Sequence, residues 1–388
     1  MECKKEKVFQ FIDEHREEMV NLWQEVVDMK SGPHEKAGID VVGKRFQSVL
    51  NDLGAATRQV EFEQAGNMLI GELGTDRAKA GVLFMGHMDT ACPAETVVGR
   101  NFTIRDGIAY GPGVLDMKGG IVAALYAVKA LQHIGYETRP IKFVLAGDEE
   151  VLHARSTAAD TFVEEAKGFA AAFNVETGFK DNGIVVGRKG VMRLMMQTKG
   201  VAAHAGNDPE NGRNAIEELA HKLLAVQRLT DWEKGISFNV GVIEGGTTST
   251  TVPEMATIYI DVRYKDPEDY PAIMASVEAI VAQTFIEGTT TTVRFMEGIK
   301  PMKTTEGVNA LFEVVKAASA ECGFDEPYAK YVGGASDSAY SVIAGVPTVC
   351  AMGVKGARNH SPEEHAVVDT LFERAKLLAA CVLNLDEQ

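Results

Sequence analysis

Apolar residues follow two different patterns in the first half of the chain. Residues 4–30 carry apolar side chains at helical spacing, which predicts one amphipathic helix, and residues 38–53 predict a second helix that ends at Gly54. Near-continuous apolar runs, as expected of strands buried on both faces of a sheet, occur at 80–85, 141–146 and 170–175. A further strand at 67–72 and a helix at 119–135 complete an alternation that predicts an α/β sheet covered by helices.

The pattern changes to alternation of apolar and polar residues after about residue 187. Alternating runs and helical spacing predict strands at 191–199, 252–264 and 290–296 and helices at about 211–229 and 267–287. We interpret this region as a β-α-β-β-α-β unit, which resembles a ferredoxin-like sandwich.

The α/β pattern returns at about residue 301. Helices are expected at 306–322, 337–345 and 368–384, with a strand at 346–351. We therefore predict one α/β domain with a mostly parallel sheet covered by helices, formed by residues 1–187 and 301–388. An inserted ferredoxin-like α+β domain, residues 188–300, interrupts it.

Composition and charge narrow the classes of function. The 388 residues are 45% hydrophobic and 24% charged, which is ordinary for a globular protein. A net charge of −16 argues against nucleic acid or an anionic membrane as a partner. The sequence shows neither a run of 18 apolar residues nor the apolar core of a signal peptide. Its five scattered cysteines, without a CxxC pair, suit free thiols in a reducing cytoplasm and argue against cysteine-bound zinc.

Candidate chemistry gathers where the predicted strands end. Open α/β sheets place their sites at the carboxyl ends of strands. The acidic and imidazole residues in this setting are His87, Asp116, Glu150, Glu176 and His360. Each one alone is more often a structural histidine or a turn carboxylate, so the case depends on their local settings together.

The first two settings have the geometry of metal ligands. His87 and Asp89 are two residues apart in an extended segment, so Asp89 can accept the second ring N–H of His87, a common support for zinc ligands. The alternative is a polar turn. Asp116 lies in the glycine-rich run 111–120, which lacks the GxxxxGK[ST] pattern of a phosphate loop. A single Asp with two free oxygens suits a carboxylate that bridges two metal ions.

The acidic run after the strand at 141–146 offers a second kind of chemistry. Neighbouring carboxylates raise one another's pKa unless a cation lies close. Glu150 can therefore bind metal while Glu149 stays free to take a proton from water. The alternative is a solvated acidic turn. Oxygen and imidazole ligands without thiolates suit paired Zn²⁺, with Mn²⁺ or Co²⁺ as alternatives, and two such ions would polarise a carbonyl and activate water.

In this ordered set of motifs the chain resembles the family of dizinc exopeptidases and deacylases that includes carboxypeptidase G, aminoacylase and succinyl-diaminopimelate desuccinylase. The resemblance runs over nearly the whole chain and implies a zinc exopeptidase-like fold. It implies that His87 and Glu176 hold one zinc ion and that Glu150 and His360 hold the other. Asp116 would bridge the two ions of each subunit.

The resemblance also implies roles for residues that do not bind metal. Asp89 would orient His87, and Glu149 would act as general base and later as general acid. The peptide bond after Asp116 is expected to be cis. His204, within Ala203-His204-Ala205-Gly206, would reach the site of a partner subunit and stabilise the oxyanion, which requires a homodimer formed through the inserted domain.

Substrate contacts are implied by further matches and two departures. Arg263 and Gly334 lie in segments close to those of carboxypeptidase G. Lys300 stands where that enzyme has an Arg for the substrate carboxylate, and Lys lacks the bidentate fork. Thr250 stands where the family commonly has Asn and is shorter.

These observations lead to a metal-dependent amide hydrolase that releases a C-terminal amino acid. Our first expectation is a carboxypeptidase G-like glutamate carboxypeptidase in the cytoplasm, acting on small peptides or N-acyl amino acids. An N-acyl amino acid deacylase or a dipeptidase would use the same chemistry. A non-catalytic binding relative is the remaining alternative, and it would be expected to have lost a ligand or Glu149.

Overall fold

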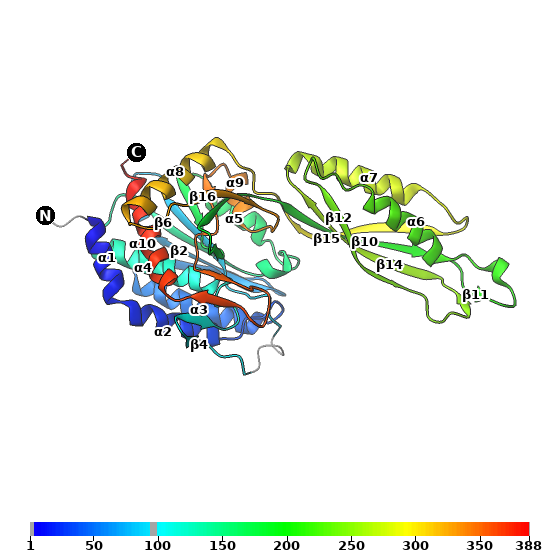
Figure 1. Cartoon of the computed structure of the whole chain (residues 1–388), viewed down its shortest axis with the longest axis horizontal. Helices are drawn as coiled ribbons and strands as arrows, with labels where there is room; N and C mark the ends of the chain where they lie inside the picture. The colour runs from blue at the N-terminus through cyan, green and yellow to red at the C-terminus, as the bar shows by residue number, and fades with distance from the viewer. Residues whose placement is uncertain (1–3, 94–98, 388) are drawn as a thin grey trace. The chain divides into compact units, whose positions relative to one another are not determined.

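The computed structural model describes residues 4–93 and 99–387, so Cys3 lies outside the described residues. The chain divides into two compact units (Figure 1). Unit 1 comprises residues 1–187, 304–331 and 336–388, and unit 2 comprises residues 188–303 and 332–335. The assignment of catalysis to one part of the chain and dimerisation to the other stays a prediction.

A six-stranded sheet forms the centre of unit 1. Its order is β1 (Ala56–Val60), β2 (Gly66–Leu73), β6 (Ile141–Gly147), β3 (Val82–His87), β7 (Ala171–Asn174) and β17 (Thr348–Val349). The four strands from β6 to β17 are parallel, whereas β1, β2 and β6 pair antiparallel. The sheet is therefore mixed, but it is mostly parallel as predicted, because only β2 runs against the other five strands. A short connection joins β1 to β2, and parallel neighbours need a crossover of a dozen residues or more.

Helices cover this sheet. They are α1 (Lys4–Glu14), α2 (Arg16–Asp28), α3 (Lys36–Asp52), α4 (Lys118–His133), α5 (Ala158–Ala166), α8 (Glu306–Glu321), α9 (Ser338–Ile343) and α10 (Asp369–Asn384). The single helix predicted over 4–30 is wrong, because the chain breaks between α1 and α2 at His15. The His15 ring lies 2.7 Å from the carbonyl oxygen of Phe11, and this local bond competes with helix continuation.

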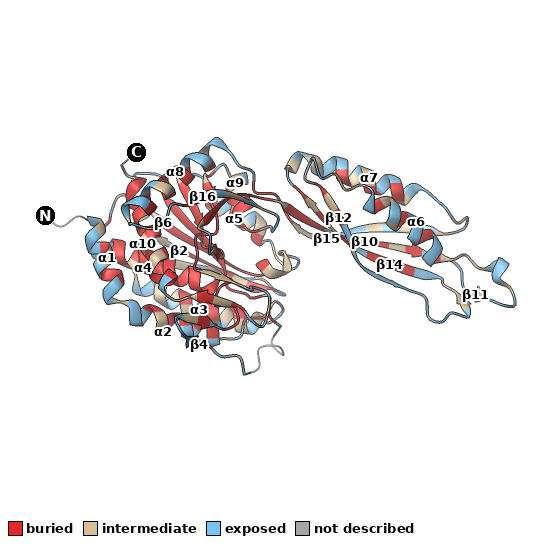
Figure 2. Cartoon of the chain, viewed as in Figure 1, coloured by how far each residue is buried: buried red, intermediate tan, exposed pale blue. Residues whose placement is uncertain are grey.

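The core of unit 1 lies between the parallel strands and α4. Every residue of β3 and β6 is buried, and α4, which is rich in small residues, packs against α1, α2 and α10 (Figure 2). A Cβ added at Gly120 would lie 1.9 Å from the carbonyl oxygen of Val175. Glycine therefore allows α4 to approach the residue that precedes Glu176, and this brings the loop before α4 close to the end of β7.

Smaller sheets complete unit 1. One has the order β4 (Thr103–Arg105), β5 (Ile108–Tyr110), β19 (His365–Val367), β18 (Lys355–Ala357) and β8 (Gly178–Phe179). Strands β9 (Gly183–Arg188) and β16 (Tyr328–Val332) form a pair. A 3₁₀ turn, η2 (Glu149–Val151), follows β6 directly.

Unit 2 is an antiparallel sheet with two helices. The sheet order is β12 (Ser237–Gly245), β14 (Met255–Tyr264), β10 (Gly190–Lys199) and β15 (Thr290–Ile299). Helices α6 (Ala215–Gln227) and α7 (Tyr270–Ala282) pack on one face, and β11 (Ala203–His204), β13 (Thr251–Val252), η3 (Pro209–Asn211) and η4 (Pro267–Asp269) complete the unit. The element order is β-α-β-β-α-β, as predicted.

Two strand predictions in unit 2 need correction. Strand β12 was not among the predicted strands, because it is a mostly exposed edge strand with an irregular register around Gly241. The strand predicted over 252–264 is two strands, since Pro253 has no N–H for a ladder and separates β13 from β14.

No helix within residues 4–93 and 99–387 is long and apolar enough to span a bilayer.

Candidate metal centre

His87 is the last residue of β3 and lies at the centre of the site. It is 1% exposed. Its Nδ1 lies 3.0 Å from the backbone oxygen of Asp89 and 3.4 Å from the Asp89 carboxylate. Asp89 therefore flanks the ring on the side predicted from the two-residue spacing, and it leaves Nε2 free to face the other candidate ligands.

The Asp89 carboxylate makes a further connection that the sequence did not indicate. It is fully buried, and it accepts hydrogen bonds from the backbone N–H groups of Glu149, at 3.2 Å, and Glu150, at 3.0 Å. The ends of β3 and β6 are thereby fixed to one another. Asp89 thus holds the imidazole of His87 at its backbone oxygen and the acidic turn after β6 at its carboxylate.

Asp116 lies between the two histidines. Its Oδ1 is 3.2 Å from Nε2 of His87, and its Oδ2 is 3.2 Å from Nε2 of His360. Asn359, which was not among the predicted residues, donates a hydrogen bond of 3.0 Å to the same Oδ2. The peptide bond from Asp116 to Met117 is cis, as the family resemblance implies.

Each imidazole also lies near one glutamate. Nε2 of His87 is 3.7 Å from Oε1 of Glu176, and Nε2 of His360 is 3.3 Å from Oε2 of Glu150. Glu150 Oε1 is buried and has no hydrogen-bond partner. A buried carboxylate oxygen without a donor is a group that a bound cation would satisfy. The structure thus brings together all five of the predicted ligands.

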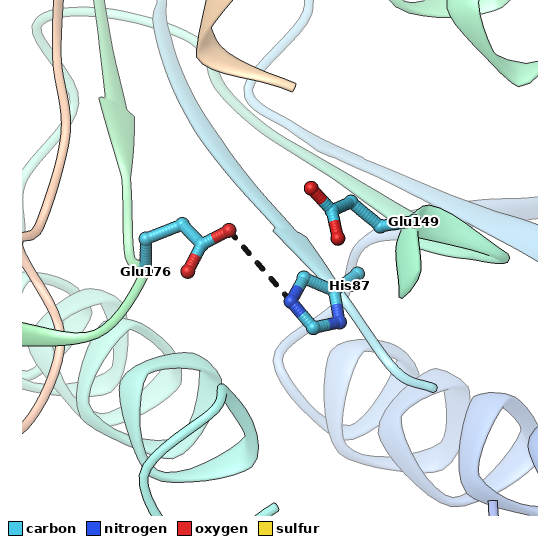
Figure 3. Close-up of side chains that lie close together, drawn as sticks. All are labelled: His87, Glu149 and Glu176. Atoms are coloured by element: carbon cyan, nitrogen blue, oxygen red, sulfur yellow. Dashed lines mark ion pairs between the residues drawn. The ribbon is translucent and has the colours of Figure 1, made fainter. Parts of the chain in front are cut away.

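Glu149 shares this environment. Figure 3 shows the carboxylates of Glu149 and Glu176 directed toward the ring of His87. One donor atom from each of these three residues lies within 4.8 Å of the others, and the same holds for His87, Asp116 and Glu150. The two groups share His87. Geometry alone therefore gives Glu149 the reach of a ligand as well as that of a base.

The electrostatics of the site favour a cation. Burial raises the pKa of Glu149 well above its ordinary value, and the nearby carboxylates of Glu176 and Asp337 add to the rise. Burial and the charge of Asp116 likewise raise the pKa of Glu150. A bound cation would favour the ionised form of both carboxylates, which burial and the neighbouring negative charges disfavour.

The pKa of Asp116 is shifted in the opposite direction, and the pKa of the neighbouring His87 is raised. Burial disfavours the Asp116 anion, but hydrogen bonds from His360 and His87 outweigh it and lower the pKa of Asp116. Burial also opposes a charge on His87, yet Asp116 and Asp89 hold the pKa of His87 well above its ordinary value. The donors, all oxygen or imidazole nitrogen, fit zinc.

Glu364 was not predicted from the sequence, and its side chain holds the backbone around Asp116. Its buried carboxylate accepts backbone N–H bonds from Gly113, Leu115 and Asp116 at 2.9–3.0 Å. Burial and the charge of Asp116 raise the pKa of Glu364 to about 7. Its position four residues after His360 was visible in the sequence, but nothing there distinguishes it from the exposed Glu363.

The remaining predicted residues belong to unit 2. These are His204, Thr250, Arg263, Lys300 and Gly334. His204 is exposed, and its Nδ1 accepts the backbone N–H groups of Gly206 and Asn207 at 3.1 Å. Arg263 donates through Nε and Nη2 to the Asp261 carboxylate at 2.7 and 2.9 Å. The site described above is formed by unit 1 alone, so the roles of these five residues stay predictions.

Comparison with known proteins supports the resemblance. Carboxypeptidase G2 of Pseudomonas sp. (strain RS-16) is 26% identical over 384 residues, covering 97% of this chain and 92% of that protein. A succinyl-diaminopimelate desuccinylase of Stenotrophomonas maltophilia (strain R551-3) is 27% identical over 342 residues, covering 82% of this chain and 88% of that protein. The crystal structure of aminopeptidase PepT from Bacillus cereus ATCC 10987 shares the fold, with a TM-score of 0.77, 24% identity and coverage of 96% and 99%.

A family model gives the assignment. The model described as peptidase family M20/M25/M40 matches residues 83–384, a span that begins within β3 and ends with α10. It therefore includes every residue of the metal centre. The resemblance to carboxypeptidase G and its relatives is confirmed, and this chain belongs to peptidase family M20/M25/M40.

Proposed function

We propose that this member of a peptidase family is a two-zinc amide hydrolase that releases a C-terminal amino acid, in the manner of a glutamate carboxypeptidase. The observation that carries the proposal is the position of Asp116. Each of its two oxygens faces a different imidazole at 3.2 Å, and each imidazole has its own glutamate. Two separate half-sites joined by one carboxylate suit two ions better than one.

The ligand sets follow from this division. His87 and Glu176 would hold one zinc ion, Glu150 and His360 would hold the other, and Asp116 would contribute one oxygen to each. Mn²⁺ and Co²⁺ accept the same donors. When bound, the two ions would polarise the scissile carbonyl and make a water molecule more acidic.

The protein side of the reaction centres on Glu149. Its carboxylate is buried beside the half-sites, and burial raises its pKa, so it suits the acceptance of a proton from water. Glu149 would take a proton from the attacking water and deliver it to the leaving amine. Asp89 holds the backbone of Glu149 and the ring of His87, and so fixes the base relative to one ligand.

Unit 2 would supply the substrate contacts. His204 would stabilise the oxyanion, and Thr250, Lys300 and Gly334 would contact the substrate. Arg263 is a weaker candidate for the carboxylate, because the Nε/Nη2 edge of its guanidinium, one of the edges that can bind a carboxylate in bidentate fashion, already holds Asp261. Lys300, as a point charge, would then be the main anchor.

A second candidate function is an N-acyl amino acid deacylase or dipeptidase. The Lys at position 300 favours it, because a substrate carboxylate held without a bidentate fork is selected less strictly. The similarity to a succinyl-diaminopimelate desuccinylase also favours it. A non-catalytic binding function has the least support, since the five proposed metal ligands and Glu149 are all present.

We also propose a homodimer formed through unit 2. Strand β12 lies at an edge of its sheet, and Val242 and Ile243 on it are 49% and 56% exposed. Exposed apolar edge strands are commonly covered by pairing. A dimer is also what the proposed role of His204 requires. Four described cysteines are free thiols, which fits the proposed cytoplasmic location.

A hydrolysis panel tests the proposal. Metal-free and zinc-loaded protein are compared on acyl-glutamates, N-acetyl amino acids and simple dipeptides. Zinc-dependent cleavage of acyl-glutamates supports the carboxypeptidase function, and cleavage of the other substrates instead supports the second candidate. If the zinc-loaded protein cleaves none of them, the proposed function is wrong.

A further inference from the structure

A buried histidine outside the metal centre joins two distant acidic segments. His153 is 7% exposed. Its Nδ1 lies 2.8 Å from Oδ1 of Asp148, and its Nε2 lies 2.6 Å from Oδ1 of Asp337. We refer to Asp148, His153 and Asp337 as the imidazole bridge. None of the three was assigned a role from the sequence.

The imidazole bridge closes the turn that carries the candidate base. Asp148 directly precedes Glu149 and Glu150, and the backbone N–H of His153 donates to the Asp148 carbonyl oxygen at 3.1 Å. Leu152 and His153 both have left-handed backbone angles, with φ of +55° and +54°. Non-glycine residues adopt this conformation only when their surroundings hold them there. The turn is thus held at its backbone and at the His153 side chain.

Buried aromatic side chains pack beside the imidazole bridge. The His153 ring lies next to Phe162, at a centroid distance of 6.3 Å, and next to Tyr340, at 5.9 Å. These two rings stack on one another at 6.2 Å. Asp337 precedes α9 and is 1% exposed. The ring of His153 therefore cannot reorient without displacing packed aromatic side chains.

Removing His153 would leave two buried carboxylates without their shared donor. The second oxygens of Asp148 and Asp337 are buried and have no hydrogen bond. A ring that carries a proton on both nitrogens, and so a positive charge, can donate to both carboxylates. Burial opposes this charge, but Asp337 and Asp148 outweigh it and hold the pKa of His153 well above its ordinary value. Without His153 the two anions would repel one another and move the turn between them.

We propose that His153 is a positioning residue that holds the carboxylates of Glu149 and Glu150 in place by tying Asp148 to Asp337. This inference rests on the proposed function for its catalytic consequence, but its structural consequence concerns metal binding alone. Asp89 fixes the backbone N–H groups of Glu149 and Glu150 from the β3 side. The imidazole bridge fixes Asp148 and His153, which flank these two residues, so the two supports act on one short segment.

The test uses the full chain with His153→Gln, which keeps a donor for one carboxylate but cannot reach both. We expect kcat to fall about 10- to 100-fold while KM changes less than about threefold, and zinc affinity to fall by a similar factor of about 10 or more. Zinc affinity is measured by competition with a chelator. All assays are run at a temperature where circular dichroism shows the variant to be folded. His133→Gln is the matched control, because His133 is exposed on α4 and has only a ring contact with Phe11.

A second variant keeps the test decisive if His153→Gln does not fold. Asp337→Asn retains the shape and an acceptor but removes one charge, and it is expected to show the same losses to a smaller degree. Combining the two substitutions should cost little more than the larger single effect, since both break one connection. A merely structural role would lower the melting temperature and leave kcat and zinc affinity of the folded protein unchanged, which would overturn the proposal.

Failure of the two proposals can be told apart. If the wild type hydrolyses no substrate of the panel, the proposed function fails, and the zinc affinity of the variants alone decides the role of His153. If the wild type is active and the folded variants keep both kcat and zinc affinity, the inference about His153 fails and the proposed function stands.

Discussion

At the scale of single residues, the division of labour between Glu149 and Glu150 is the sharpest claim. The two carboxylates are adjacent in sequence and share the Asp89 anchor, yet only Glu150 lies within 3.3 Å of His360. We assign metal binding to Glu150 and proton transfer to Glu149. Replacing each one should therefore affect different measurable properties.

Glu149→Gln is expected to lower kcat by about 10²–10⁴-fold, the usual contribution of a general acid–base group. Zinc content and KM should stay near wild-type values, because the ligands are untouched. Steady-state kinetics and metal analysis measure both. Glu363→Gln, an exposed carboxylate near the site, is the control. Retention of full activity by Glu149→Gln at saturating zinc would show that the mechanism is wrongly assigned.

Glu364 illustrates what a sequence can and cannot reveal at this scale. The five predicted ligands do meet in the structure, but the sheet edge accounts for only three of them. His87, Glu150 and Glu176 lie at or just after the carboxyl ends of the parallel strands β3, β6 and β7. Asp116 and His360 reach the site from loops outside that sheet. Glu364 and His153 act through backbone N–H groups and through other carboxylates. Such roles depend on which segments lie side by side in the fold, and no spacing rule along the chain encodes that.

At the scale of elements, Lys118 ties the start of α4 to the end of α2. It is 1% exposed, and its Nζ donates to the carbonyl oxygens of Val26 and Met29 at 2.7 and 3.0 Å. Burial lowers the pKa of Lys118 to about 7. The unfolded chain, with an ordinary lysine pKa near 10.4, therefore binds more protons than the folded chain between about pH 7 and pH 10.

The free energy of unfolding is consequently expected to rise with pH across that window because of Lys118. In Lys118→Met this contribution should be absent. The free energy of unfolding of the variant, measured with urea from pH 7 to pH 10, should therefore rise less with pH than that of wild type. Lys129→Met is the control, since Lys129 is a partly exposed residue of the same helix. Identical slopes for wild type and Lys118→Met would contradict the assigned cause.

Close approach of α4 to the end of β7 gives a second prediction for an element. A Cβ at Gly120 would lie 1.9 Å from a backbone oxygen, whereas a Cβ at Gly43 in α3 would meet only the flexible Met88 side chain at 3.5 Å. Gly120→Ala should lower the free energy of unfolding by about 3 kcal/mol or more, which is the upper end of the usual cost of overpacking a core. Gly43→Ala should change the unfolding free energy by about 1 kcal/mol or less. Equal stability of the two variants in denaturant unfolding would refute this account of the packing.

The elements also show why local pattern was a better guide to some segments than to others. Strands β3, β6 and β7 were predicted because burial on both faces leaves an almost uninterrupted apolar run. Strand β12 was not predicted because an exposed edge strand needs no such apolar run. The helix break at His15 was not predicted because the apolar spacing continues through it. The pattern of apolar residues reflects which positions are buried. It does not reveal a helix break when the apolar spacing continues across that break.

At the scale of the whole molecule, unit 1 holds the metal centre and unit 2 holds the residues proposed to contact substrate. If unit 2 also forms the proposed dimer, disruption of its edge strand should separate the subunits. Ile243→Lys is expected to convert a dimer to a monomer in analytical ultracentrifugation, because it places a charge on the exposed apolar edge of β12.

The control for this change is Ile104→Lys, which alters a residue of unit 1 with 44% exposure. It should leave the mass in solution unchanged. Activity should fall in Ile243→Lys and not in Ile104→Lys if His204 acts in the site of a partner subunit. A wild-type protein that sediments as a monomer at all concentrations would contradict the dimer proposal.

The central claim is that two ions joined by Asp116 make this chain a hydrolase, and titration of metal-free protein with Zn²⁺ tests it most directly. Hydrolysis of the best substrate of the panel and bound zinc are followed together during the titration. We predict that activity rises to a plateau at two zinc ions per chain and that Asp116→Asn abolishes the rise. Full hydrolysis by protein shown to be free of metal, or a plateau without any bound zinc, would contradict the account.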